Sequence, residues 1–208
     1  EAEFEQQKNT ICVCNEQEWE SKSWLREKYD IFFEKPVIHF CKLEQLPEYL
    51  FATFRIPPKQ ENEVSRAFFF YLLPEKIVFI DNGTTVETQL QKLMAKKLRG
   101  GYTLERFLYD FLSGFLEEDL LFLQKLEKEI SMIEELVLRG NCPEFNRKML
   151  FIKKKISRFY RYYTQLADVG QELLDNETDF FGKQERQMFD RYKDRVVRLA
   201  GETQILRD

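Results

Sequence analysis

The chain has 208 residues, of which 43% are hydrophobic and 33% charged, and its net charge is -4. This composition is typical of a globular protein with a real core, and the acidic balance argues against a dedicated nucleic-acid binder, which needs an excess of Lys and Arg. The longest apolar run, Ala67–Leu73, is far shorter than the about 20 residues of a membrane helix, and the polar start of the chain does not resemble a signal peptide.

The first hundred residues alternate between strand-like and helix-like segments. Short runs rich in β-branched and aromatic residues predict strands, and longer amphipathic runs predict helices. The predicted strands are Thr10–Cys14, Tyr49–Ile56, Phe68–Leu73 and Ile77–Ile80, with helices over Glu16–Lys28 and Thr84–Leu98. The last two strands are separated by a short link and are expected to pair as a hairpin. We therefore predict an α/β domain over residues 1–100, a mixed sheet with both faces covered by helices.

Beyond a Gly100-Gly101 hinge the sequence predicts only helices. Thr103 is positioned to cap one helix from Leu104 to Leu138 or Arg139, and Pro143 suits the first turn of the next. The tight turn between them predicts a long antiparallel hairpin over residues 101–180. A third helix begins near Lys183 and has no closing residue at its end. We interpret residues 181–208 as the beginning of a stalk helix that continues beyond this sequence.

The two hairpin helices carry opposite charge. Leu104–Gly140 has nine acidic and four basic side chains, whereas Pro143–Asp168 has seven basic and two acidic. One interpretation is that the two helices pair by charge, and the alternative is that the basic helix offers a surface to anionic lipid or nucleic acid. The charges alone favour the first.

No enzyme motif is present, and the only histidine, His39, has no nucleophile spaced to pair with it. We therefore expect that the protein is not an enzyme. The four cysteines lack metal-site spacing and are expected to be reduced structural thiols, with a zinc site that includes His39 as the alternative. They are Cys12, Cys14, Cys41 and Cys142.

Asp119 is the one acidic residue in a seam that is otherwise aliphatic. The seam has the spacing of a helix that packs against other helices and comprises Leu112, Leu116, Asp119, Leu123, Leu126, Ile130, Ile133 and Val137. A buried carboxylate needs a cation or a donor, unless the seam is open to solvent at that position. The two possibilities are an ion pair with Arg158 or Arg161 across the hairpin, and a hard divalent cation held together with Glu118.

Several segments in this order resemble the CorA-like family of divalent-cation transporters. They are Leu104–Leu112, Leu116–Leu121, Leu126–Ile130, Ile133–Glu135, the segment Leu73–Asn82, Asp194–Leu199 and Leu206–Asp208. The resemblance implies an α/β/α cytoplasmic domain, the helical hairpin and a stalk helix that leads into the pore. It also implies a homopentamer in the inner (plasma) membrane, with this part of the chain on the cytoplasmic side.

The resemblance further implies transport of Mg²⁺, or of Co²⁺ or Ni²⁺, regulated by divalent ions between neighbouring subunits. From the acidic charge balance we expect no nucleic-acid partner. The resemblance places the metal ligands at Asp119, Glu118, Glu34, Asp190 and Asp194. Tyr192, Val196 and Leu199 on the stalk are expected to contact other subunits rather than the core. Two alternatives stay open: a ZntB-type zinc transporter and a soluble coiled-coil scaffold that binds protein partners.

Overall fold

A computed structural model describes residues 7–32, 35–96, 102–140, 143–177 and 179–207. It contains a five-stranded sheet in the order β1-β5-β4-β3-β2. The strands are β1 (Thr10–Cys14), β2 (Lys42–Gln45), β3 (Leu50–Ile56), β4 (Arg66–Leu73) and β5 (Lys76–Ile80). Because β1 runs parallel to β5 and the other pairs are antiparallel, the sheet is mixed, as predicted.

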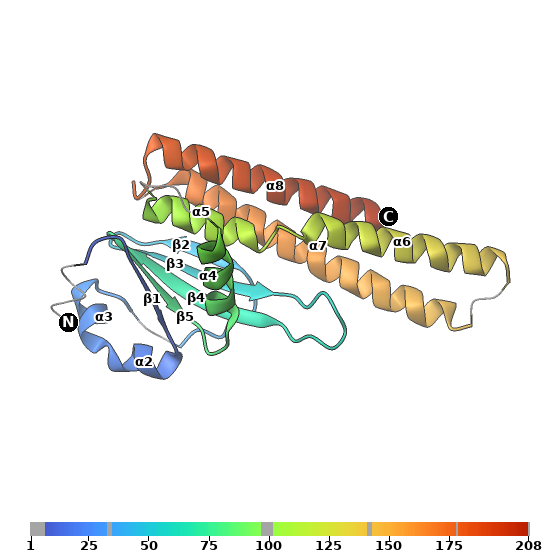
Figure 1. Cartoon of the computed structure of the whole chain (residues 1–208), viewed down its shortest axis with the longest axis horizontal. Coiled ribbons are helices and arrows are strands. Elements are labelled where there is room, and N and C mark those ends of the chain that lie inside the picture. The colour runs from blue at the N-terminus through green and yellow to red at the C-terminus, as the bar shows by residue number, and fades with distance from the viewer. Residues whose placement is uncertain (1–6, 33–34, 97–101, 141–142, 178, 208) are drawn as a thin grey trace.

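Helices cover both faces of this sheet, which confirms the α/β/α prediction (Figure 1). On one face, Trp19 of α2 (Glu16–Ser21) stacks on Tyr71, and Leu25 of α3 (Ser23–Lys28) is buried in the same core cluster. On the other face lie α4 (Thr85–Ala95) and the long helices. The central strands β4 and β5 are buried on both sides, which explains why their sequences read as continuous apolar runs rather than as alternating ones.

The helix predicted over Leu104–Arg139 is two helices, α5 (Leu104–Gly114) and α6 (Asp119–Leu138). The side chain of Gln89 from α4 lies against Gly114 and donates to the carbonyl oxygen of Phe111 at 3.2 Å, where a larger residue than glycine would clash. The ring of Phe115 turns onto Phe68 of the sheet, with centroids 5.7 Å apart. Packing against α4 and the sheet therefore ends α5 at Gly114, although the apolar spacing in the sequence continues beyond that residue.

A guanidinium from α8 (Lys183–Arg207) closes this break. Arg195 donates to the carbonyl oxygen of Leu116 at 2.8 Å; this oxygen also accepts the backbone N–H of Asp119 at 3.2 Å, three residues ahead instead of the four of a continuous helix. The α5–α6 break is therefore joined to α8 by a side-chain bond to the backbone.

The remaining long helix, α7 (Phe145–Asp175), forms the predicted antiparallel hairpin with α6 and also packs along α8 (Figure 1). A Cβ on Gly170 would lie 3.0 Å from Cβ of Lys193, so the glycine lets the two helices approach closely. Tyr192, Val196 and Leu199 are buried in the chain's own core. The expectation that they are exposed subunit contacts is wrong, because α7 covers them.

Among the described residues, no helix combines the length and the apolar composition that a bilayer crossing requires. The domain boundaries at residues 100 and 180 stay predictions, and the Gly100-Gly101 hinge lies outside the described residues.

Candidate functional site

The Asp119 carboxylate is buried at the start of α6, directly after the break, with its side chain 1% exposed. Its counter-charge is Lys59, whose Nζ lies 2.6 Å from Asp119 Oδ1. Lys59 belongs to the connection between β3 and β4, far from Asp119 in the sequence. The ion pair predicted with Arg158 or Arg161 is therefore wrong, because α7 places the buried Tyr163 near Asp119 while both arginines are exposed.

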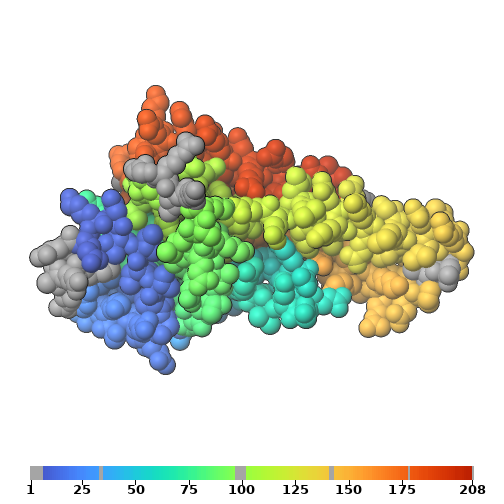
Figure 2. Space-filling model, in the orientation of Figure 1, coloured from blue at the N-terminus to red at the C-terminus, as the bar shows by residue number. Residues whose placement is uncertain are grey.

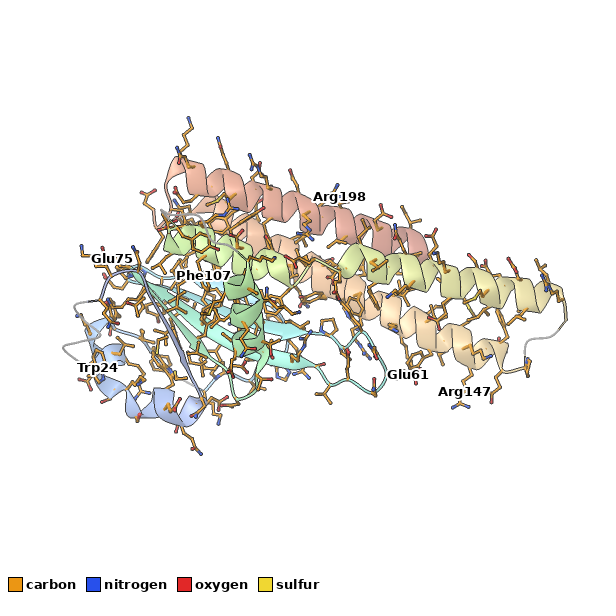
Figure 3. The ribbon with its side chains drawn as sticks, in the orientation of Figure 1. Trp24, Glu61, Glu75, Phe107, Arg147 and Arg198 are labelled. Carbon is orange, nitrogen blue, oxygen red and sulfur yellow. The ribbon has the colours of Figure 1, made fainter. Side chains whose placement is uncertain are left out.

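The β3–β4 connection, residues 57–65, is held in a fixed shape beside the helical hairpin. Glu63 Oε2 accepts the backbone N–H groups of Lys59 at 3.0 Å and Gln60 at 3.3 Å. Figure 2 shows the connection in cyan directly beneath the first part of α6, and Figure 3 labels Glu61 near its tip. The local bonds thus aim Lys59 towards Asp119.

Two ammonium groups flank the aromatic ring of Phe122 in this region. Lys59 Nζ lies 5.8 Å from the ring centroid and Lys155 Nζ lies 5.5 Å from it, distances at which a cation is attracted to the ring. The same residues line a hollow of about 250 Å³ together with Glu118 and Glu129. The opening beside Asp119 is therefore of mixed charge.

Buried tyrosines lie beneath Asp119. Burial raises the pKa of Tyr163 well above its ordinary value, and the negative charge of Asp119 raises it further. Burial likewise raises the pKa of Tyr192, with smaller contributions from Cys41 and Asp119. These hydroxyls stay neutral at physiological pH, so Lys59 is the cation that balances Asp119.

The other predicted metal ligands lie in separate places. Glu118 is exposed beside Asp119, whereas Asp190 and Asp194 lie on the exposed side of α8, and Glu34 is outside the described residues. Asp190 is 52% exposed and its Oδ1 lies 3.7 Å from Lys193 Nζ. Across the described ranges, no three His, Cys, Asp or Glu side chains gather in a metal-binding group.

The cysteines that the structure describes do not gather into the alternative zinc site. Cys14 packs in the core on one face of the sheet and Cys41 in the core on the other. His39 is exposed, and Cys142 lies outside the described residues. A hydrogen bond with Cys14 lowers the pKa of Cys12 to about 7, against the opposing effect of burial.

The sequence interpretation named two acidic residues on the exposed side of α8, Asp190 and Asp194, and missed the other residues of that side. Because Tyr192, Val196 and Leu199 of α8 are buried, the opposite side of the helix faces outward. We call a row of residues along this exposed side the outer row of α8. It comprises Asp190, Asp194, Val197, Gly201 and Ile205. Val197 is 52% exposed, Ile205 is 71% exposed, and a Cβ on Gly201 would meet nothing within 4 Å. The spacing of this row in the sequence was the signal that could have identified it.

Known structures share this fold. The soluble domain of CorA from Methanocaldococcus jannaschii superimposes with a TM-score of 0.74 at 17% identity, covering 95% of this chain and 82% of that one. The complete CorA magnesium transporter from the same organism gives 0.73 at 18% identity, covering 95% of this chain, which spans 64% of that one. The ZntB cytoplasmic domain from Vibrio parahaemolyticus gives 0.62 at 13% identity, with coverages of 95% and 84%.

No curated protein sequence matches the chain. The family model described as CorA-like Mg²⁺ transporter protein matches residues 7–208, which is almost the whole sequence. With the predicted fold confirmed and this match in hand, the chain belongs to the CorA-like Mg²⁺ transporter protein family.

Proposed function

We propose that this chain is the cytoplasmic, ion-sensing part of a homopentameric transporter that carries Mg²⁺, or Co²⁺ or Ni²⁺, across the plasma membrane. The observation that carries the proposal is the outer row of α8, in which two exposed carboxylates are followed by exposed apolar residues and a glycine. Membership of the family supports the transport role. No enzymatic activity is part of the proposal.

The outer row suits contact between copies of the chain. Val197 and Ile205 offer apolar side chains that water now covers, and Gly201 lets a neighbouring backbone approach. Residues spaced three and four apart are those that meet between parallel helices. We infer that α8 is the helix around which the copies assemble.

Asp190 and Asp194 give this contact its dependence on metal ions. Carboxylates brought together from several copies repel one another, and a hard divalent cation that binds their oxygens removes the repulsion. Bound ions therefore favour the associated, closed arrangement, and their loss favours an open one through a shift in populations. Their exposure on α8 is compatible with such ligation.

Glu118, Asp119 and Glu34 form the second part of the proposed ligand set. Glu118 is exposed and available for an ion. Asp119 becomes available to an ion only when the residues that bury it move, because its side chain is 1% exposed and Oδ1 is in contact with Lys59 Nζ at 2.6 Å. We therefore assign the first binding of ions to α8 and a dependent role to Asp119.

The likeness to the ZntB cytoplasmic domain keeps zinc as the alternative cargo, since one fold serves both. The other alternative, a soluble coiled-coil scaffold, differs from both transporters because it has no membrane-spanning part. The coding sequence after residue 208 separates them: two apolar spans joined by a Gly-Met-Asn segment support transport, and a stop codon directly after Asp208 contradicts it.

Sedimentation velocity on the purified chain, with Mg²⁺ or with EDTA, tests the ion-sensing proposal. We expect Mg²⁺ to promote association, and the double variant Asp190→Asn, Asp194→Asn to lose that response. Glu202→Gln on the flank of the same exposed side of α8 is the control and should behave like the unaltered chain. Association that ignores Mg²⁺, or that survives in the double variant, contradicts the proposal.

A further inference from the structure

A second hollow, of about 600 Å³, lies where the end of β3 meets α7, away from Asp119. It is separate from the outer row of α8 and takes no part in the function proposed above. Its wall combines residues from the segment before β2, the end of β3, the β3–β4 connection and α7. The residues that matter are His39, Arg55, Glu63, Arg158, Arg161 and Gln165.

Three guanidinium groups line this hollow with one carboxylate. Arg158 and Arg161 lie one turn apart on α7, are exposed, and form no ion pair with the described residues. Arg55 donates to the carbonyl oxygen of Ile38 at 2.9 Å, which fixes its position. The carboxylate, Glu63, accepts the backbone N–H groups of its own loop and is held there. The hollow therefore has a net positive charge that the chain does not neutralise.

Neutral donors accompany the charges. The Gln165 side-chain oxygen accepts the backbone N–H of Cys41 at 3.0 Å, so its amide nitrogen is directed away from that bond. Ser65 adds a hydroxyl to the wall. Guanidinium groups with neighbouring amide and hydroxyl donors form the set that proteins use for phosphate, because the planar fork matches its oxygens.

We infer that this hollow binds a small phosphate-bearing anion, a pyrophosphate or nucleoside polyphosphate, through Arg55, Arg158 and Arg161. The volume lies in the range of small-molecule pockets, and the concave wall suits a soluble ligand better than a flat membrane surface. The inference also gives a role to two of the seven basic side chains of the Pro143–Asp168 segment, since Arg158 and Arg161 line this hollow rather than pairing with the acidic helix. A bound anion joins the end of β3 to α7.

Isothermal titration calorimetry of the purified chain in EDTA, with inorganic pyrophosphate and with ATP as separate probes, tests the inference. We expect binding of at least one probe, weakened about tenfold or more in the double variant Arg158→Gln, Arg161→Gln, because charge-assisted hydrogen bonds are lost. The matched control, Lys153→Gln with Arg198→Gln, removes the same charge from exposed sites outside the hollow and should bind normally.

A flotation assay with phosphatidic acid vesicles forms the second arm. Binding to vesicles without binding to either soluble phosphate overturns the assignment, as does equal weakening in the two double variants, which would indicate nonspecific attraction. Absence of heat with both probes also overturns it. Because EDTA is present throughout, the outcome is independent of metal-driven association.

Discussion

The pair of Lys59 and Asp119 is expected to stabilise the fold asymmetrically. Asp119 is 1% exposed and Lys59 is 27% exposed. Lys59→Met leaves a carboxylate in the core without its cation, which costs about 3 kcal/mol because the charge has no access to water. Asp119→Asn leaves an ammonium that can turn towards solvent, so we expect a smaller loss of about 1 kcal/mol. The lysine variant should therefore unfold at clearly lower denaturant concentration.

Urea unfolding followed by circular dichroism measures both variants and the double variant. If the cost of Lys59→Met arises from the orphaned charge, the double variant should be more stable than Lys59→Met alone, with a coupling of about 2 kcal/mol. Costs that simply add, with coupling below about 0.5 kcal/mol, refute the reasoning and reduce the pair to a surface contact. Lys125→Met, which removes a lysine from the wall of the same hollow, is the control and should change little.

Two further predictions concern the contact between α7 and α8 and the cysteines of the edge strand β1. Gly170→Ala should destabilise the chain by about 1 kcal/mol, because the added Cβ would lie 3.0 Å from Lys193 Cβ, whereas Gly201→Ala should stabilise it by up to about 1 kcal/mol, because nothing lies within 4 Å of the added Cβ. Thermal unfolding of the unassociated chain measures both variants. Equal effects of the two substitutions would contradict the close approach of α7 and α8. Cys12, whose pKa is lowered to about 7, should react with iodoacetamide as a thiolate above that pH. Cys14→Ala removes the hydrogen bond to Cys12 and should therefore raise the pH at which the alkylation rate of Cys12 reaches half its maximum. An unchanged midpoint pH would contradict the link between the two thiols.

Local patterns were sufficient for much of the fold. The strands β1, β3, β4 and β5 follow from short apolar runs with clear ends, and the start of α8 at Lys183 follows from amphipathic spacing. The polar edge strand Lys42–Gln45 was missed because an edge strand needs no apolar run. The helix predicted over Glu16–Lys28 is interrupted at Lys22.

The errors in the long helices come from contacts between distant parts of the chain. The spacing of Leu112, Leu116 and Asp119 continues across the break, so periodicity could not reveal that Gln89 and the sheet interrupt the backbone there. The choice of Lys59 as partner for Asp119 depends on where the β3–β4 connection folds. The spacing placed Asp119 in the seam but left open whether the seam is exposed to solvent there; both its burial and its partner required the tertiary structure.

The bond from Arg195 to the carbonyl oxygen of Leu116 sets the register of α8. A helix packed only through apolar side chains can slide by one turn and find equivalent contacts, but a guanidinium bonded to a single carbonyl has no equivalent partner one turn away. The bond from Lys193 Nζ to Gln171 Oε1 of α7 at 3.2 Å and the close approach of Lys193 to Gly170 hold α8 in the same register. Of these contacts, the Arg195 bond is the one that ties α8 to residue 116, three residues before Asp119, so a displacement of α8 along its axis would strain the backbone at the start of α6.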